Sequence, residues 1–148
     1  MAETRHAIAN WSGNLTEGGG MLQYVSSGAI ARLPITWSSR TEAHNGRTSP
    51  EELLAAAHAS CYAMAFSNQL AKNGTVATKV EVRVEVTADK GEAGWTVLSS
   101  KIATSAVVPG IDQAKFEELA NAAKDGCPIS RAITGNVELS VEATLLEG

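Results

Sequence analysis

The sequence predicts an α+β fold in a single domain, residues 1–148, and three observations lead to this prediction. Short alternating segments fill the first third of the chain, a long apolar helical segment follows, and long alternating strands then flank a second helix. Strands and helices in this order are typical of the α+β class. A chain of 148 residues has the size of one domain and can bury a core of useful size.

The first third of the chain is predicted to form short strands. Residues 6–11 alternate loosely between apolar and polar, and the three glycines 18–20 mark a turn after them. Residues 21–26 and 29–35 could pair as a hairpin. The polar stretch 38–48 is predicted to be a loop.

The most strongly marked element is a helix that runs from residue 49 to residue 72. Ser49 suits the N-cap, Pro50 the first helical position, and Glu52 completes a capping box. Asn73 and Gly74 end the helix. Because most of its residues are apolar, the helix is expected to be central rather than at the surface.

Strands and helices continue to the end of the chain. Valines at every second position from 80 to 86 alternate with charged residues, which is the clearest strand pattern in the sequence. The elements predicted after it are a turn at 89–94, a strand at 95–108, a helix at 112–124 that stops at Gly126, a short helix from Pro128, and a strand at 137–143.

Composition argues against several classes of function. The net charge is −4 and no basic cluster occurs, so nucleic-acid binding is not expected. The longest apolar run, residues 53–65, is too short for a membrane span. The N-terminus lacks the apolar core of a secretion signal, so we expect a cytoplasmic protein, in which a disulfide would be transient or catalytic.

The two cysteines of the chain occupy positions at which a thiol can react. Cys127 lies between a helix stop and Pro128, near an N-cap where backbone N–H groups favour a thiolate. Cys61 lies in the middle of the apolar helix and needs a cation to ionise at neutral pH. Local chemistry alone therefore predicts that Cys127 has the lower pKa.

One helix face carries polar or reactive residues beside Cys61. Positions 51, 54, 58, 61 and 65 share this face, and His58 lies one turn before Cys61. Glu51 lies roughly 15 Å from Cys61 along the axis, too far for direct contact. A guanidinium could hold the carboxylate and the thiolate together, and Arg40 and Arg47 are the candidates.

Other interpretations of these residues stay open on the sequence pattern alone. Cysteines are among the most buried residue types, so Cys61 and Cys127 could be inert core residues. His58 could be a packed or capping histidine. Together the three could hold a metal ion, but neither Cys-x-x-Cys nor His-x-x-x-His spacing is present.

Three segments resemble a known family. Residues 48–61, from Thr-Ser-Pro-Glu-Glu to Ala-His-Ala-Ser-Cys, resemble the first-cysteine helix of the osmotically induced protein C (OsmC) and organic hydroperoxide resistance family. Residues 108–112 and 126–130, Val-Pro-Gly-Ile-Asp and Gly-Cys-Pro-Ile-Ser, resemble its second-cysteine region. His58 is similar to the OsmC branch, because the other branch usually has a tyrosine there.

The resemblance implies an OsmC-like fold of antiparallel sheets and a long central helix, in an interwoven homodimer. It also implies a thiol peroxidase that reduces organic hydroperoxides. Cys61 would attack the peroxide and Cys127 would resolve the sulfenic acid, with Glu51 and Arg40 matching the family's supporting pair and Arg47 as the weaker alternative. An external dithiol would be the reductant, and no metal, flavin or haem cofactor would be needed.

Two rival functions remain beside the peroxidase. A compact stress-type protein with an apolar helix could bind a small ligand without catalysis, with its thiols serving as packing. A thiol–disulfide exchanger is the other, although the Cys-x-x-Cys motif is missing.

Overall fold

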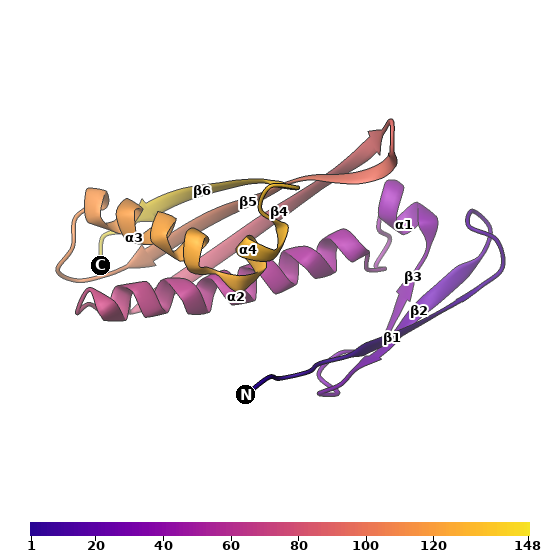
Figure 1. Ribbon diagram of the computed structural model, residues 1–148, viewed down its shortest axis with the longest axis horizontal. Coiled ribbons are helices and arrows are strands. Elements are labelled where there is room, and N and C mark those ends of the chain that lie inside the picture. Colours follow the sequence, from indigo (N-terminus) through magenta and orange to yellow (C-terminus); the bar gives the residue numbers. More distant parts are fainter. The chain divides into compact units, whose positions relative to one another are not determined.

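The computed structural model describes residues 1–148, which form two compact units, residues 1–53 and residues 54–148. The predicted α+β class is confirmed, because each unit contains a three-stranded sheet accompanied by helical segments (Figure 1). The long helix α2 begins in the first unit and continues through the second.

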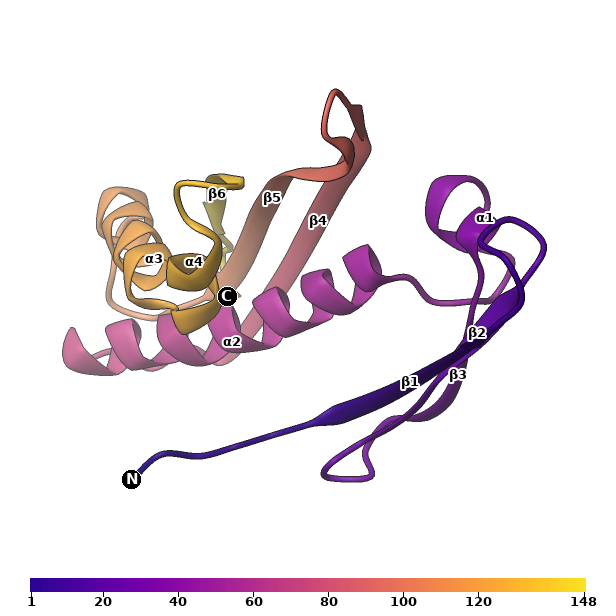
Figure 2. The same cartoon turned by 45° about the vertical axis from the view of Figure 1, so that its right-hand side comes forward.

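The first unit contains an antiparallel sheet in the order β1-β2-β3. The three strands follow one another in the chain and can be traced in Figure 2. The predicted strands are confirmed, with bounds that differ by a few residues. They are β1 (Ala7–Ser12), β2 (Gly19–Val25) and β3 (Ala31–Ile35).

A short helix, α1 (Trp37–Thr41), follows β3 where the sequence predicted only a loop. Thr36 begins it with a reciprocal capping box: the Ser39 amide donates to Thr36 Oγ1 at 3.1 Å, and the Thr36 amide donates to Ser39 Oγ at 3.0 Å. The prediction was wrong because serine stands where the usual box has glutamate or glutamine. The helix places Arg40 in its last turn.

The long helix α2 (Pro50–Lys72) has both of its predicted ends. At the start, the Glu52 amide donates to Ser49 Oγ at 3.1 Å. At the end, Gly74 adopts a φ of +76° and the Thr75 amide reaches back to the Leu70 carbonyl at 3.0 Å. Glycine suits this left-handed position because it has no Cβ. None of the helices combines the length and the apolar composition that a membrane span requires.

The second unit contains a sheet in the order β4-β5-β6. The antiparallel pairing predicted for the sheets holds for β4 and β5, whereas β6 runs parallel to β5. A parallel neighbour requires a long crossover, and two helices form it. The elements are β4 (Lys79–Gly91), β5 (Gly94–Val107), α3 (Gln113–Gly126), α4 (Pro128–Ile133) and β6 (Glu138–Leu145).

The core of the second unit lies between its helices and one face of its sheet (Figures 1 and 2). Three fully buried side chains of α2, Tyr62, Phe66 and Leu70, recur at every fourth position. Phe66 packs edge to face against Phe116 of α3 at 5.2 Å, and the Tyr62 hydroxyl donates to the Ala120 carbonyl at 2.8 Å. These contacts fix α3, and the segment that follows it, against α2.

Candidate functional site

The structure brings the two thiols together within the second unit. Cys61 lies on α2 and Cys127 lies at the junction of α3 and α4, and both are free thiols. Cys61 is half-buried and Cys127 is fully buried. Their side chains lie close enough for each thiol to shift the pKa of the other. The two cysteines can therefore react with each other without a large rearrangement.

Cys127 is held as both the C-cap of α3 and the N-cap of α4. Its own amide donates to the Ala123 carbonyl at 2.8 Å. The amides of Ile129 and Ser130 and the Ser130 hydroxyl, in the first turn of α4, lie near enough to its sulfur to lower the pKa of Cys127, although the sulfur makes no regular capping hydrogen bond. Pro128 at the first helical position preorganises this turn.

These donors make Cys127 the more acidic thiol of the pair. Burial raises the pKa of Cys127, but the hydrogen bonds from Ser130, Cys61 and Ile129 outweigh burial and leave the pKa below its ordinary value. The prediction made from the helix position is confirmed. The α4 amides and the Ser130 hydroxyl are the groups that would stabilise a Cys127 thiolate.

For Cys61 the net shift of the pKa is upward. Burial raises the pKa of Cys61, the Ile129 amide lowers it, and the hydrogen bond and charge of Cys127 raise it further. The net result lies above the ordinary value, so Cys61 holds its proton more tightly than Cys127 does. None of these groups is a cation. Cys61 therefore needs a positive charge from elsewhere before it can act as a thiolate near neutral pH.

His58 is fully buried and is held from both sides by serine hydroxyls. Its Nδ1 lies 2.7 Å from Ser100 Oγ on β5, and its Nε2 lies 2.7 Å from Ser130 Oγ on α4. Burial lowers the pKa of His58, so the resting imidazole is neutral. The structure shows no hydrogen bond between His58 and Cys61, the neighbour suggested by the sequence, and no group of three or more potential metal ligands.

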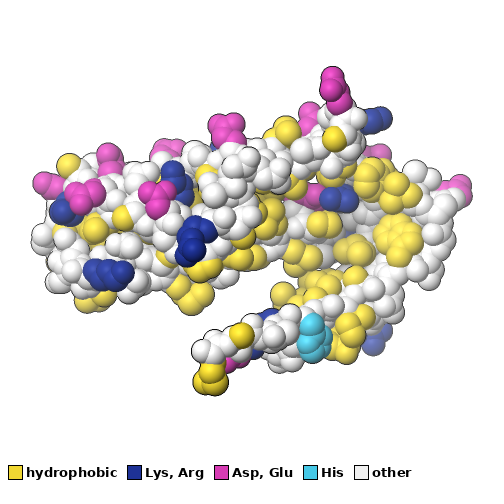
Figure 3. Space-filling model, in the orientation of Figure 1, with side chains coloured by type: hydrophobic (Ala, Val, Ile, Leu, Met, Phe, Trp, Pro, Cys, Tyr) yellow, Lys and Arg dark blue, Asp and Glu magenta, His cyan; other side chains and the backbone are white.

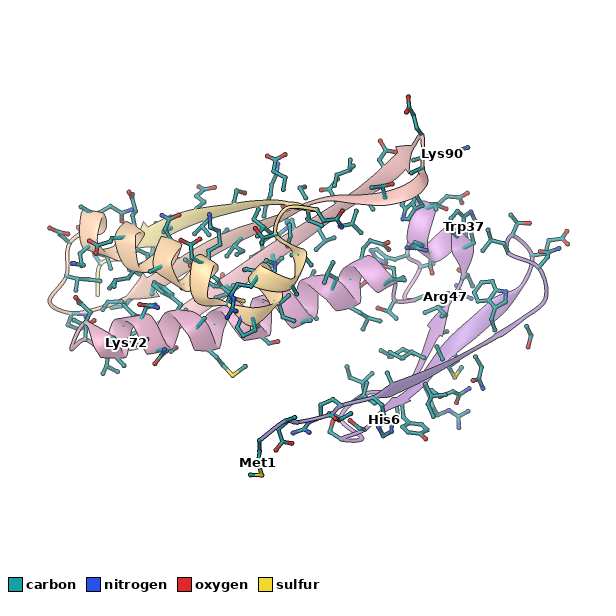
Figure 4. The ribbon with its side chains drawn as sticks, viewed as in Figure 1. Met1, His6, Trp37, Arg47, Lys72 and Lys90 are labelled. Atoms are coloured by element: carbon teal, nitrogen blue, oxygen red, sulfur yellow. The ribbon has the colours of Figure 1, made fainter.

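Arg40 and Glu51 form an ion pair within the first unit. Both Nε and Nη2 of Arg40 lie 2.9 Å from Glu51 Oε1. The Glu51 side chain is 11% exposed and that of Arg40 is 31% exposed. The guanidinium also lies 5.8 Å from the ring centre of Trp37, which Figure 4 labels at the start of α1. The guanidinium is thus held between a carboxylate and an aromatic ring.

Arg47, the alternative arginine, has a different environment. It is exposed in the segment between α1 and α2, labelled in Figure 4, and makes no ion pair. It lines a surface pocket of about 410 Å³ together with strand residues of the same unit. The carboxylate partner expected for one of the two arginines is thus bound by Arg40.

Two residues of this network, Ser100 and Ser130, were missed by sequence reasoning. Ser130 is the third residue of α4, where a hydroxyl can reach the group at the N-cap. Ser100 occupies an inward position of β5, in a strand whose inward positions should be apolar. A polar residue at such a position could have signalled a buried partner.

Comparison with known proteins places these residues in a family context. Residues 43–142 match the family model described as OsmC-like protein. The chain is 34% identical over 134 residues to Peroxiredoxin OsmC of Escherichia coli K12, which covers 90% of this chain and 92% of that protein. It is 29% identical over 140 residues to the organic hydroperoxide resistance protein OhrB of Bacillus subtilis, covering 91% of this chain and 98% of that protein.

The fold agrees with the sequence matches. The crystal structure of OhrB from Bacillus subtilis superposes with a TM-score of 0.72 at 25% identity, and the match covers 93% of this chain and 97% of that one. The expected OsmC-like fold is therefore confirmed.

Proposed function

Because this chain belongs to the OsmC-like protein family, we propose that it is a cysteine-based hydroperoxide reductase that acts in stress defence. The observation that carries this proposal is the pair of neighbouring reduced thiols, Cys61 and Cys127, on separate elements of one unit. Two relatives, a peroxiredoxin and an organic hydroperoxide resistance protein, support the choice of substrate class.

The proposed cycle has three steps. The Cys61 thiolate attacks the distal peroxide oxygen, so an S–O bond forms, the O–O bond breaks, and the alkoxide leaves as alcohol after gaining a proton. Cys127 then attacks the Cys61 sulfenic acid, forming the disulfide and releasing water. An external dithiol reduces the disulfide and is itself oxidised.

Arg40 is proposed to supply the cation that Cys61 needs. Burial and Cys127 both raise the pKa of Cys61, and the groups acting on it within its own unit include no positive charge. Arg40 is held by Glu51 in the first turn of the helix that carries Cys61. A guanidinium donates to thiolate and peroxide oxygens alike, so one residue can stabilise the nucleophile and orient the substrate. Glu51 keeps that guanidinium in place.

Organic hydroperoxides are expected to be turned over faster than hydrogen peroxide. Apolar residues surround Cys61 on α2, and Arg40 lies against the Trp37 ring. Each methylene that a substrate buries on such surfaces adds about 0.8 kcal/mol to binding, and hydrogen peroxide has none. We expect an advantage of about tenfold in kcat/KM for cumene and tert-butyl hydroperoxide, near 1.4 kcal/mol.

Steady-state rates with dithiothreitol as reductant and each of the three peroxides test this expectation. A preference for hydrogen peroxide would refute the apolar substrate site. Absence of consumption of any peroxide would refute the proposed function and leave ligand binding without catalysis as the better interpretation.

Peroxide treatment of the reduced protein is expected to form a disulfide between Cys61 and Cys127 of one chain. The two thiols already contact each other, and no other cysteine is present in the chain. Mass spectrometry should find the loss of two hydrogens and a linked pair of peptides. A disulfide between two chains, or a singly overoxidised cysteine as the main product, would contradict the proposed cycle.

We also propose that residues 1–148 act as one OsmC-like domain in a cytoplasmic homodimer. The family match spans the boundary between the two units. The sheet of the first unit leaves large apolar side chains exposed, including Ile8, Trp11 and Tyr24, which a second copy would cover. Sedimentation at low micromolar concentration should give about twice the chain mass of 15.4 kDa. A folded, active monomer would contradict this proposal.

A further inference from the structure

One serine hydroxyl lies between the buried histidine and the buried thiol of the second unit. Ser130 Oγ lies 2.7 Å from His58 Nε2, and the same hydroxyl lies close enough to the sulfur of Cys127 to favour its thiolate. On the far side of the ring, Ser100 Oγ lies 2.7 Å from His58 Nδ1. His58, Ser100, Ser130 and Cys127 are all fully buried or nearly so.

Because the Ser130 hydroxyl has a single proton, it couples the protonation states of Cys127 and His58. When Cys127 is a thiol, its S–H can donate to Ser130, whose O–H then donates to a neutral His58 Nε2. When Cys127 is a thiolate, Ser130 donates to the sulfur, and the oxygen of Ser130 can then only accept from His58. The ionisation of Cys127 thus requires a proton on His58 Nε2.

We propose that His58 is a positioning residue that acts through Ser130: it takes up the thiol proton of Cys127 as Cys127 becomes the nucleophile toward the Cys61 sulfenic acid. In the resting tautomer that we assign to the ring, Nδ1–H donates to Ser100 Oγ, which leaves Nε2 free to receive the proton. This inference rests on the proposed function for its place in the cycle, whereas the proton linkage belongs to the reduced protein alone.

The step balances in atoms and charge. The Cys127 proton moves to Ser130 Oγ while the Ser130 proton moves to His58 Nε2. The Cys127 sulfur then forms the S–S bond as the S–O bond of the sulfenic acid breaks, and the departing hydroxide gains a proton to become water. His58 returns its proton through Ser130, so that the net reaction is sulfenic acid plus thiol to disulfide plus water.

The surroundings offer the relay a route to solvent. Ser130 lines a surface pocket of about 340 Å³ whose other walls include Lys124 and Asp125 of α3 and Arg131 of α4. Figure 3 shows lysine and arginine side chains over the α3 side of this unit. Burial disfavours an added positive charge on His58, so its proton is held briefly and then released.

The other titratable groups beside the thiol are Cys61 and Tyr62 of α2. Burial, and secondarily the charge of Cys127, raises the pKa of Tyr62 above the range of interest. Cys61 is the partner thiol and is removed in one arm of the test below. From β5 the contact with His58 is the uncharged hydroxyl of Ser100.

Nitrogen NMR of the histidine rings tests the linkage directly. In the reduced wild-type protein, as Cys127 ionises with rising pH, the Nε2 signal of His58 should change from acceptor to N–H type while Nδ1 changes from N–H to acceptor type, so that one proton is released to solvent overall. In Cys127→Ser that step should vanish. If His58 keeps one neutral form while Cys127 ionises, the proposal is overturned.

Thiolate absorbance provides a second measurement. In Cys61→Ser, Cys127 is the remaining thiol, and its ionisation can be followed in the ultraviolet without any reagent reaching the buried sulfur. Adding His58→Gln or Ser130→Ala should raise the pH of ionisation by about one unit, a tenfold loss of thiolate at fixed pH. Ser100→Ala should raise it by less, although Ser100 does not touch the sulfur.

Ser99→Ala is the matched control, because Ser99 is a neighbouring buried serine of β5 that makes no hydrogen bond to His58 or Cys127. It should leave the ionisation of Cys127 unchanged. If Ser130→Ala shifts the pH of ionisation of Cys127 and His58→Gln does not, only the Ser130 hydroxyl acts on the thiolate, and the role of His58 is overturned. If His58→Gln does not fold, Ser100→Ala decides in the same way. Neither measurement uses peroxide, so failure of the peroxidase proposal would appear separately.

Discussion

Replacing Cys61 by serine is expected to reduce peroxide consumption to the uncatalysed rate. The proposed first step needs a sulfur nucleophile on α2, and a serine hydroxyl at the same place is far too weakly acidic to replace it. Cys127→Ser should behave differently, because it keeps the first step and loses only resolution. One turnover with cumene hydroperoxide should then leave a sulfenic acid on Cys61, which dimedone labels for mass spectrometry.

This expectation is opposite to the order of the two pKa values, because the surroundings favour the thiolate at Cys127 rather than at Cys61. In the second unit the donors of α4 favour a thiolate at Cys127, whereas burial and Cys127 itself raise the pKa of Cys61. A dimedone adduct on Cys127 in Cys61→Ser, with none on Cys61 in Cys127→Ser, would exchange the roles of the two residues. The assignment of Cys61 therefore depends on its cation, which makes Arg40 the next residue to test.

Arg40→Ala is expected to slow the reaction with peroxide by about a hundredfold or more near neutral pH. A cation beside a buried thiolate lowers its pKa by one to three units, so its removal returns Cys61 to the thiol form. Because loss of the cation raises the pKa of Cys61, the activity of the variant should depend on pH. It should recover as the pH rises through the higher pKa of Cys61. Single-turnover rates across pH would measure both effects.

Two further variants give this test its controls. Arg47→Ala removes an equal charge from the same unit but breaks no ion pair with Glu51, so its rate should stay near that of the wild type. Arg40→Lys keeps the charge and loses the two bonds to Glu51 Oε1, so it should fall between wild type and Arg40→Ala. A loss confined to Arg47→Ala would move the role to Arg47.

The sequence could predict those elements whose causes are local. The ends of α2 follow from Ser49, Pro50 and Gly74, whose preferences act within one turn. Alternating valines predicted β4 for the same reason. The helix α1 was missed because its cap uses Ser39, a residue that occurs as often in loops. Local sequence signals predict an element only where they clearly favour one backbone conformation.

The site itself depends on contacts between distant parts of the chain. His58 meets Ser100 and Ser130 across 42 and 72 residues, and no local pattern encodes such partners. The parallel pairing of β6 with β5 was missed on the same ground, since alternation fixes the faces of a strand and not its neighbour. The pairing of Cys61 with Cys127 came from family resemblance, and the packing of α3 on α2 is its physical cause.

The contact between Cys61 and Cys127 also has a consequence for heat resistance. The two residues lie far apart in the chain, so a disulfide between them would close a loop of roughly 65 residues and remove about 4 kcal/mol of conformational freedom from the unfolded chain. The oxidised protein would then melt at a higher temperature than the reduced one. Each cycle of the proposed reaction would thus alternate between a chain with the disulfide and a chain without it. The reduced form, which would react with peroxide, would be the form most exposed to unfolding and proteolysis.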